Sequence, residues 1–344
     1  MTSPNVPDRA RRRDTHGVPS DLLRPDPLPG VTNLPTPARL TVGIVSAGRV
    51  GTAIGEALEQ AGHIVGGVLA RSDASRRRAS ARLPESEILD LPDVVGRSEL
   101  LVISVPDAEL DAVVADIAAT GALRPGTLIA HTAGARGVGV LDPLAALGAL
   151  TLAIHPAMTF VGSDDDTARL RQACFGVTAA DEVGFAIAQS LVLEMGGEPV
   201  RIAESDRALY HAALAHGANH LVALICDAVS VLDAAIDGDS GARGSATVDG
   251  TPVRLSERIL GPLVTAALQN VLELGAGALT GPVARGDADA VAGHLRALRD
   301  ATDRTDSDRT PVAADIAEGY RVLAQRAAAR TDAPQRLLDV LEVS

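Results

Sequence analysis

The sequence predicts an α/β fold, in which an N-terminal parallel sheet is followed by an all-α C-terminal domain. Short apolar, β-branched runs alternate with helical stretches from Leu40 to Ile202, which is the pattern of βαβ units. A glycine-rich turn joins the first run to the first helix. After about Glu204 the strand pattern stops, and long helical patterns follow.

These patterns divide the 344 residues into three regions. Residues 1–38 are rich in proline and charge without an apolar period, so we expect a disordered tail that buries too little surface to offset its ordering entropy. Residues 39–203 are the predicted nucleotide-binding domain, and residues 204–344 are the predicted helical domain for substrate binding and dimerisation.

Each element is predicted from its own period and its flanking turn residues. Strands are expected at Leu40–Ser46, Ile64–Ala70, Leu100–Val105, Thr127–His131, Leu150–Ile154, Phe175–Thr178 and Pro199–Ile202. Helices are expected at Gly51–Ala61, Val183–Met195, Asp206–Ala235, Ser256–Gly275, Asp287–Arg299 and Pro311–Arg330, with a loop over Asp237–Pro252.

The composition excludes several classes of function. The chain has no lysine, since all 31 of its basic residues are arginine, and this excludes Schiff-base enzymes, P-loop NTPases and any dehydrogenase with a lysine proton donor. It has no tryptophan, two tyrosines and three phenylalanines, too few for base-stacking platforms. The net charge of -13 opposes a nucleic-acid partner.

Cysteine use and hydropathy indicate a cytoplasmic protein without a membrane partner. Cys174 and Cys226 form no metal-binding or disulfide pattern, and we expect both to be buried, reduced thiols. No uninterrupted apolar run has the length of a membrane span. No apolar segment follows Arg11–Arg13, so no secretory signal is predicted. No metal site is expected.

The turn after the first predicted strand has the spacing of a dinucleotide-binding (Rossmann) fingerprint. Its cofactor-binding residues are Ser46, Ala47, Gly48, Arg49, Val50 and Gly51. Gly48 would let the backbone approach a pyrophosphate, Gly51 would let helix and strand pack closely, and the helix N-terminus would face the phosphates. Ser46 replaces the first glycine, and we expect it to keep ordinary backbone angles.

The end of the second predicted strand favours NADP over NAD. An NAD-binding protein usually has Asp or Glu there, whereas this chain has Arg71 and Ser72. Arginine can pair with a 2′-phosphate that a carboxylate would repel. Arg76–Arg78 follow in the next helix, and at least one of them is expected to face solvent.

Two further turns lie where parallel strands end, which is where ligands of such sheets bind. Val105, Pro106 and Asp107 end one strand and should border the nicotinamide ribose, although an ordinary turn fits equally well. His155 follows another strand directly and precedes Pro156. It is a candidate proton donor or substrate ligand, with hydrogen bonding to loop carbonyls as the alternative.

The first helix of the helical domain is the segment richest in polar side chains. His211 and Asn219 lie loosely on one face and are the leading catalytic candidates. His216 is a candidate substrate-binding residue. It also has i, i+4 spacing with His220, for which a dimer-interface or capping role is favoured over a metal pair. Arg285 is a candidate clamp for a substrate carboxylate, or a partner of Asp287, which is expected to cap the next helix.

These motifs, together with four more, resemble the bacterial Rossmann proteins that carry a DUF2520 domain. The additional stretches are Val105–Asp107, His131–Gly134, His155–Phe160 and Leu279–Asp287. The layout is similar to that of ketopantoate reductase, pyrroline-5-carboxylate reductase and the 6-phosphogluconate dehydrogenase superfamily. The resemblance covers residues 40–330 and implies an NADP-linked oxidoreductase, with ketopantoate as a possible substrate.

The resemblance also bears on single residues. It places Thr132 at the substrate site, but Ala133 stands where the family often has a serine, so a hydroxyl is lost. Related superfamilies place a lysine and an asparagine on the first helix of this domain. Since this chain has no lysine, a histidine would have to donate the proton, while Asn219 could orient the carbonyl.

The sequence therefore predicts an NADPH-dependent reductase of a small carbonyl acid, such as a 2-oxo acid. Hydride transfer would be paired with a proton from His211 or His155, and the chain would pair as a homodimer through the helical domain. Two alternatives stay open: an NADP-binding sensor or scaffold without turnover, and an imine reductase related to pyrroline-5-carboxylate reductase.

Overall fold

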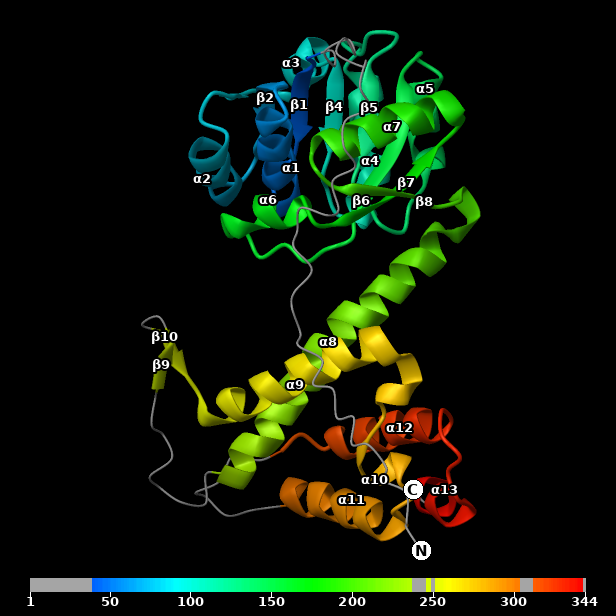
Figure 1. Cartoon of the computed structure of the whole chain (residues 1–344). Helices are drawn as coiled ribbons and strands as arrows, with labels where there is room; N and C mark the ends of the chain where they lie inside the picture. Colours follow the sequence, from blue (N-terminus) through cyan, green and yellow to red (C-terminus); the bar gives the residue numbers. More distant parts are fainter. Residues whose placement is uncertain (1–38, 237–245, 249–250, 304–311, 343–344) are drawn as a thin grey trace, which may run out of the picture.

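A computed structural model of the chain describes residues 39–236, 246–248, 251–303 and 312–342. The predicted tail, residues 1–38, lies outside the described residues. The described chain has a sheet flanked by helices and, after it, a helical part, which one long helix connects to the sheet (Figure 1). The predicted fold class is confirmed.

One eight-stranded sheet forms the first part, in the order β3-β2-β1-β4-β5-β6-β7-β8. Its strands are β1 Thr41–Val45, β2 Ile64–Leu69, β3 Glu87–Ile88, β4 Leu100–Ile103, β5 Leu128–His131, β6 Leu150–Pro156, β7 Cys174–Ala179 and β8 Glu198–Arg201. Neighbours pair in parallel except β6 and β7, which are antiparallel. The short connection through α6 (Asp165–Leu170) stays at the carboxyl edge of β6, so the chain enters β7 from that edge.

Helices cover both faces of this sheet, as a doubly wound fold requires. They are α1 Arg49–Gln60, α2 Asp73–Arg82, α3 Leu91–Arg97, α4 Leu110–Ala119, α5 Asp142–Ala145 and α7 Glu182–Glu194, with short 3-10 turns η2 Asp107–Glu109 and η3 Val138–Leu141. One apolar cluster packs α1 and α7 on one face, and another packs α3 and α4 on the other.

The helical part begins with the 3-10 turn η4 (Glu204–Asp206) and the long helix α8 (Arg207–Ile236). It continues through β9 Ala246–Val248, β10 Thr251–Val253, α9 Leu255–Leu274, η5 Gly275–Ala278, α10 Gly281–Ala284, α11 Ala288–Thr302, α12 Ile316–Ala328 and α13 Gln335–Glu342. The hairpin β9–β10 occupies part of the predicted loop, and α13 has no counterpart in the sequence prediction. Asp287 caps α11 as expected, its carboxylate accepting the N–H of Ala290.

Helices α8 and α9 cross in the helical part (Figure 1). Most apolar side chains of α9 and several of α8 are exposed. The exposed fraction is 79% for Leu272 and 61% for Val222. By length and composition the helical segments 204–236 and 255–284 could each cross a membrane. The sequence prediction of no span rests on a different criterion, because neither segment is an uninterrupted apolar run. Cys174 and Cys226 are free but exposed, so the prediction of buried thiols is wrong: both lie on outward-facing positions.

Candidate active site

The turn between β1 and α1 has a strained first position. Ser46 has a φ of +80°, so the expectation of ordinary backbone angles is wrong. The N–H groups of Ser46 and Ala47 both donate to the carbonyl of Leu69 on β2, at 3.2 and 3.3 Å, and this pairing holds the turn in a conformation that glycine adopts more easily.

The rest of the turn fits a dinucleotide. At Gly51 a Cβ would collide with the carbonyl oxygen of Ser46, so this glycine permits the close packing of α1 on β1. At Gly48, the N-cap of α1, a Cβ would meet no atom closer than 3.7 Å, which leaves open space beside the helix N-terminus. The buried hydroxyl of Ser104 nearby has no partner among the described residues. The residues present therefore suit a pyrophosphate against the backbone.

Three basic or hydroxyl side chains lie near this turn with different restraints. Arg71 is exposed and stands 4.0 Å from the Asp116 carboxylate. Ser72 caps α2 through its hydroxyl, which accepts the N–H of Ser75. Arg78 donates to the carbonyl of Ala47 at 3.0 Å, directly on the turn. The sequence indicates Arg71 and Ser72 more strongly than Arg78, because the contact of Arg78 with Ala47 depends on how α2 packs.

The end of β4 lies beside the turn and connects it to the next strand end. Val105 and Pro106 lead into η2, and the carboxylate of Asp107 accepts the N–H of Ala135 at 3.1 Å. The main chain of Gly48 lies close to the Ser104 carbonyl. The fingerprint and the loop after β5 are therefore neighbours across the carboxyl ends of the strands.

The loop that follows β5 is fixed by one side chain at its own start and one from η4. His131 accepts the N–H of Ala133 at Nδ1 and donates from Nε2 to the carbonyl of Gly137, at 3.2 and 2.9 Å. The Glu204 carboxylate accepts the N–H groups of Val138 and Gly139. This loop is therefore a rigid wall of the site.

Arg207, in the first turn of α8, joins the helical part to the sheet. Only 1% of it is exposed, and its guanidinium donates to the carbonyls of Arg136, Gly176 and Ala133 at 2.9, 3.0 and 2.7 Å. Within the described residues no carboxylate lies within ion-pair distance of it. The site thus contains a buried positive charge that is hydrogen-bonded but not neutralised.

His155 contacts both Tyr210 and His211, and the two histidines lie against Gly134. The Tyr210 hydroxyl and His155 Nδ1 are 3.0 Å apart, and the His155 and His211 rings meet edge to face with centroids 5.7 Å apart. A Cβ at Gly134 would come within 2.9 Å of the Nε2 atoms of both histidines. Both ring edges therefore occupy the place of a side chain at this position, and a glycine admits them.

Burial determines the charge of two of these histidines. Desolvation, followed in size by the positive charge of Arg207, lowers the pKa of His155 to about 4. Desolvation also lowers the pKa of His131 to about 4, against a partly compensating hydrogen bond to Gly137. Both side chains are therefore neutral at pH 7.

The remaining predicted residues lie elsewhere in the single chain. Asn219 and His216 are exposed farther along α8, Asn219 about 12 Å along the helix axis from His211. His216 Nδ1 is 2.8 Å from His220 Nδ1. Arg285 is exposed at the end of α10, in the helical part below the sheet (Figure 1). Thr132 lines a small apolar pocket with Ile54 and Ile154.

Two residues at the centre of the site, Tyr210 and Arg207, are not among the predicted site residues. Tyr210 is one of only two tyrosines in the chain, which could have directed attention to it. Arg207 has no distinguishing pattern in the sequence, because its role depends on three carbonyls from distant strands and loops.

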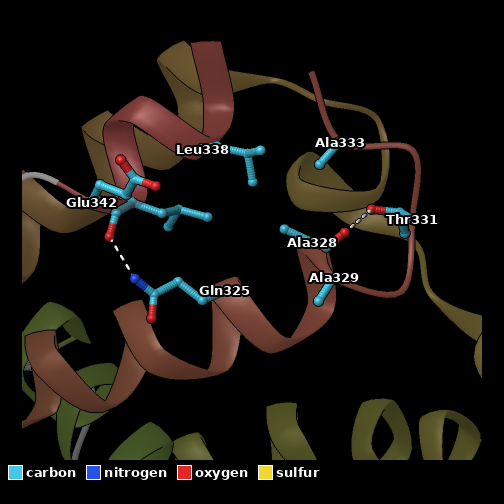
Figure 2. A pocket seen from close by; sticks show the side chains of 8 residues that line it. Gln325, Ala328, Ala329, Thr331, Ala333, Leu338 and Glu342 are labelled. Atoms are coloured by element: carbon cyan, nitrogen blue, oxygen red, sulfur yellow. Dashed lines mark hydrogen bonds between the residues drawn. The ribbon is translucent and has the colours of Figure 1, made fainter. Parts of the chain in front are cut away.

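A separate pocket of about 420 Å³ lies between α12 and α13 (Figure 2). Alanine and leucine side chains line most of it, and Gln325 donates from its side chain to the carbonyl of Leu341 at 2.8 Å. None of the predicted site residues lines this pocket. In the described ranges no group of three or more His, Cys, Asp or Glu side chains could hold a metal ion.

Comparison with known families finds two matching domains along the chain. Residues 28–156 match the Rossmann-like domain, and residues 173–327 match the domain of unknown function DUF2520. The second match begins near β7, so it includes the last two strands of the sheet. No curated protein matches the chain.

Solved structures share the fold at low sequence identity. A protein from Bacteroides fragilis named as an NADP oxidoreductase has a TM-score of 0.66 at 20% identity, covering 85% of this chain and 98% of its own. A reductive aminase from Aspergillus terreus, in complex with NADPH and ethyl-5-oxohexanoate, has a TM-score of 0.55 at 19% identity over 88% and 99%. An imine reductase variant from Myxococcus stipitatus, in complex with NAD+, has a TM-score of 0.53 at 16% identity over 88% and 99%.

Proposed function

Because this chain belongs to the proteins that join a Rossmann-like domain to a DUF2520 domain, we propose that it is an NADPH-dependent reductase of a small carbonyl compound. One observation carries the proposal. His155 meets Tyr210 and His211 beside Gly134, at the carboxyl ends of the strands that also hold the dinucleotide turn. Hydride acceptors bind at this edge of such sheets.

The cofactor sites are divided among three groups of residues. The turn from Ser46 to Gly51 would hold the pyrophosphate, Arg71 and Arg78 the 2′-phosphate, and Val105 to Asp107 the ribose next to the nicotinamide. Bound NADPH supplies the hydride. The structural neighbours named for NADP or NADPH support this choice of cofactor.

The substrate proposed first is a 2-oxo acid, with ketopantoate as the leading candidate from the family resemblance. The proton would come from the group at Gly134. His155 and His211 are the candidate donors. Because the pKa of His155 is about 4, its imidazolium is scarce at pH 7, and it would have to donate as the neutral imidazole.

An imine is the second candidate substrate. A reductive aminase and an imine reductase share the fold with this chain, and so does a pyrroline-5-carboxylate reductase from Streptococcus pyogenes, with a TM-score of 0.50 at 15% identity over 85% of this chain and 99% of its own. A sensor without turnover is the remaining alternative.

One substrate panel separates these functions. The loss of NADPH absorbance is followed with ketopantoate, other 2-oxo acids, simple ketones and cyclic imines, and NADPH binding is measured in parallel by calorimetry. We expect turnover with at least one carbonyl compound. Binding of NADPH without turnover of any compound would support the sensor, and turnover of imines alone would support the imine reductase.

A further inference from the structure

We propose that Tyr210 and His155 form a proton relay that serves a carbonyl substrate, with the buried Arg207 stabilising the phenolate that the relay leaves behind. The proposal rests on the proposed reductase function and deepens it, since it specifies the substrate class and the acid of the same site. It starts from the 3.0 Å contact between the Tyr210 hydroxyl and His155 Nδ1.

The two nitrogens of His155 have different surroundings. When Nδ1 accepts the Tyr210 hydroxyl, the imidazole proton is on Nε2. Nε2 lies against Gly134, so close that a Cβ there would come within 2.9 Å of it. A carbonyl oxygen that reached this edge of the ring would therefore meet the Nε2–H of a neutral histidine.

The step balances without an imidazolium. Bound NADPH would supply a hydride to the carbonyl carbon, and the electron pair of the C=O π bond would move to oxygen. That oxygen takes the Nε2 proton of His155, while Nδ1 takes the phenolic proton of Tyr210. The products are an alcohol, the other neutral tautomer of His155 and a Tyr210 phenolate, which later regains a proton from solvent.

Arg207 is placed to stabilise this phenolate. Its guanidinium carbon lies 5.6 Å from the centroid of the Tyr210 ring, and its charge has no carboxylate at ion-pair distance within the described residues. Burial raises the pKa of Tyr210, and the charge of Arg207 acts against that rise. In a chain without lysine, arginine is the cation available for this role.

The neighbouring strand also shapes the position of Tyr210. At Gly176 on β7 a Cβ would lie 2.7 Å from the Tyr210 hydroxyl and ring carbon. The absence of a side chain there admits the ring between β7 and α8. The titratable or charged groups that act on Tyr210 and His155 are Arg207 and His211 on α8, Cys174 on β7, Asp107 on η2 and His131 on β5.

The same charges favour a neutral carbonyl over an iminium cation. Arg207 places a buried positive charge in the site. The nearby carboxylates of Asp107 and Glu204 already accept backbone N–H groups. At His155 the positive charge of Arg207 acts more strongly than the negative charge of Asp107. An iminium ion there would meet a like charge that is offset only in part, whereas an alkoxide forming on a carbonyl oxygen is stabilised by the charge of Arg207.

The test compares Tyr210→Phe with Tyr320→Phe. Tyr320 is the other tyrosine, and its hydroxyl lies 2.8 Å from His294 Nδ1 in the helical part, so it is the same kind of pair outside the site. We expect Tyr210→Phe to lower kcat for carbonyl reduction by about 100-fold or more, with the Kd for NADPH within threefold of wild type. Tyr320→Phe should retain full kcat.

Two further readouts identify the acid. With the relay, kcat stays level between about pH 6 and 9, because neither a neutral His155 nor a protonated Tyr210 titrates there. A donor that must be an imidazolium would instead make kcat fall as the pH rises across this range. His155→Gln, which keeps a donor but cannot pass a proton, should lower kcat as Tyr210→Phe does.

The possible results separate this proposal from the proposed function. Carbonyl turnover that survives Tyr210→Phe within threefold would overturn the relay and leave the reductase intact. Turnover of cyclic imines alone would overturn the choice of a carbonyl. Absence of turnover with every compound would remove the reductase and the relay together.

Discussion

At the scale of single residues, Arg78 and Arg71 differ in how firmly the structure holds them. Arg78 is tied to the carbonyl of Ala47 on the dinucleotide turn, while Arg71 is exposed with a distant partner. A guanidinium that is already positioned loses less side-chain entropy when it binds a phosphate. Arg78 should therefore contribute more to NADPH binding than its place in a run of three arginines indicates.

We predict that Arg78→Gln raises the Kd for NADPH about tenfold, the value of one charge-assisted hydrogen bond. The Kd for NADH, which lacks the 2′-phosphate, should change less than twofold. Calorimetry with both nucleotides measures this, and Arg77→Gln is the matched control because Arg77 is exposed on the same helix. Equal effects of the two variants would show a general charge effect and contradict a specific contact.

At the scale of elements, the loop between β5 and η3 carries most of the site. The side chains of His131, Asp107 and Glu204 hold it by hydrogen bonds. His131 is completely buried, and its pKa is lowered to about 4 by burial. In the unfolded chain a histidine has its ordinary pKa of 6.5. As the pH falls, the unfolded state therefore binds the proton before the folded state does. Its contribution to stability is therefore fully present above pH 6.5 and is lost as the pH falls toward 4.

We predict that the free energy of unfolding falls by about 3 kcal/mol between pH 6.5 and 4 because of His131 alone, since each pKa unit is worth about 1.4 kcal/mol. Urea unfolding of wild type and His131→Gln at several pH values measures this, and the variant should lose that part of the slope. His294→Gln, at an exposed position, should keep the wild-type slope. An unchanged slope in His131→Gln would contradict the prediction.

The elements themselves could be predicted because their signals are local. The strands from β1 to β8, except the two-residue β3, and the long helices follow from apolar period and turn residues. The strain at Ser46 could not be read in this way, because it depends on a pairing with Leu69 on β2. The meeting of Tyr210 with His155 depends on how α8 leaves the sheet. Arg207 fixes that departure through carbonyls of the loop after β5 and of β7.

At the scale of the whole molecule, α8 and α9 expose large apolar side chains to solvent. Leu268 and Leu272 share one face of α9 at i, i+4 spacing, with exposed fractions of 45% and 79%. Asn270 and Glu273 stand among them, and a lipid interior would have to desolvate both. A second copy of the chain could cover the leucines and leave such polar groups at a wet rim.

We therefore propose that two copies of the chain form a homodimer through these helices. In such a dimer, Arg285 and Asn219 of one copy could approach the site of the other copy, which they do not reach within one chain. Light scattering should give twice the chain mass of 35.2 kDa. Leu268→Glu combined with Leu272→Glu should weaken dimerisation by at least 100-fold, since each buried leucine is worth roughly 1.5–3 kcal/mol. Leu147→Glu, at an exposed position beside the sheet, is the control and should remain dimeric. A monomeric wild-type protein would overturn the proposal, and flotation of that monomer with lipid vesicles would assign the apolar helices to a membrane instead.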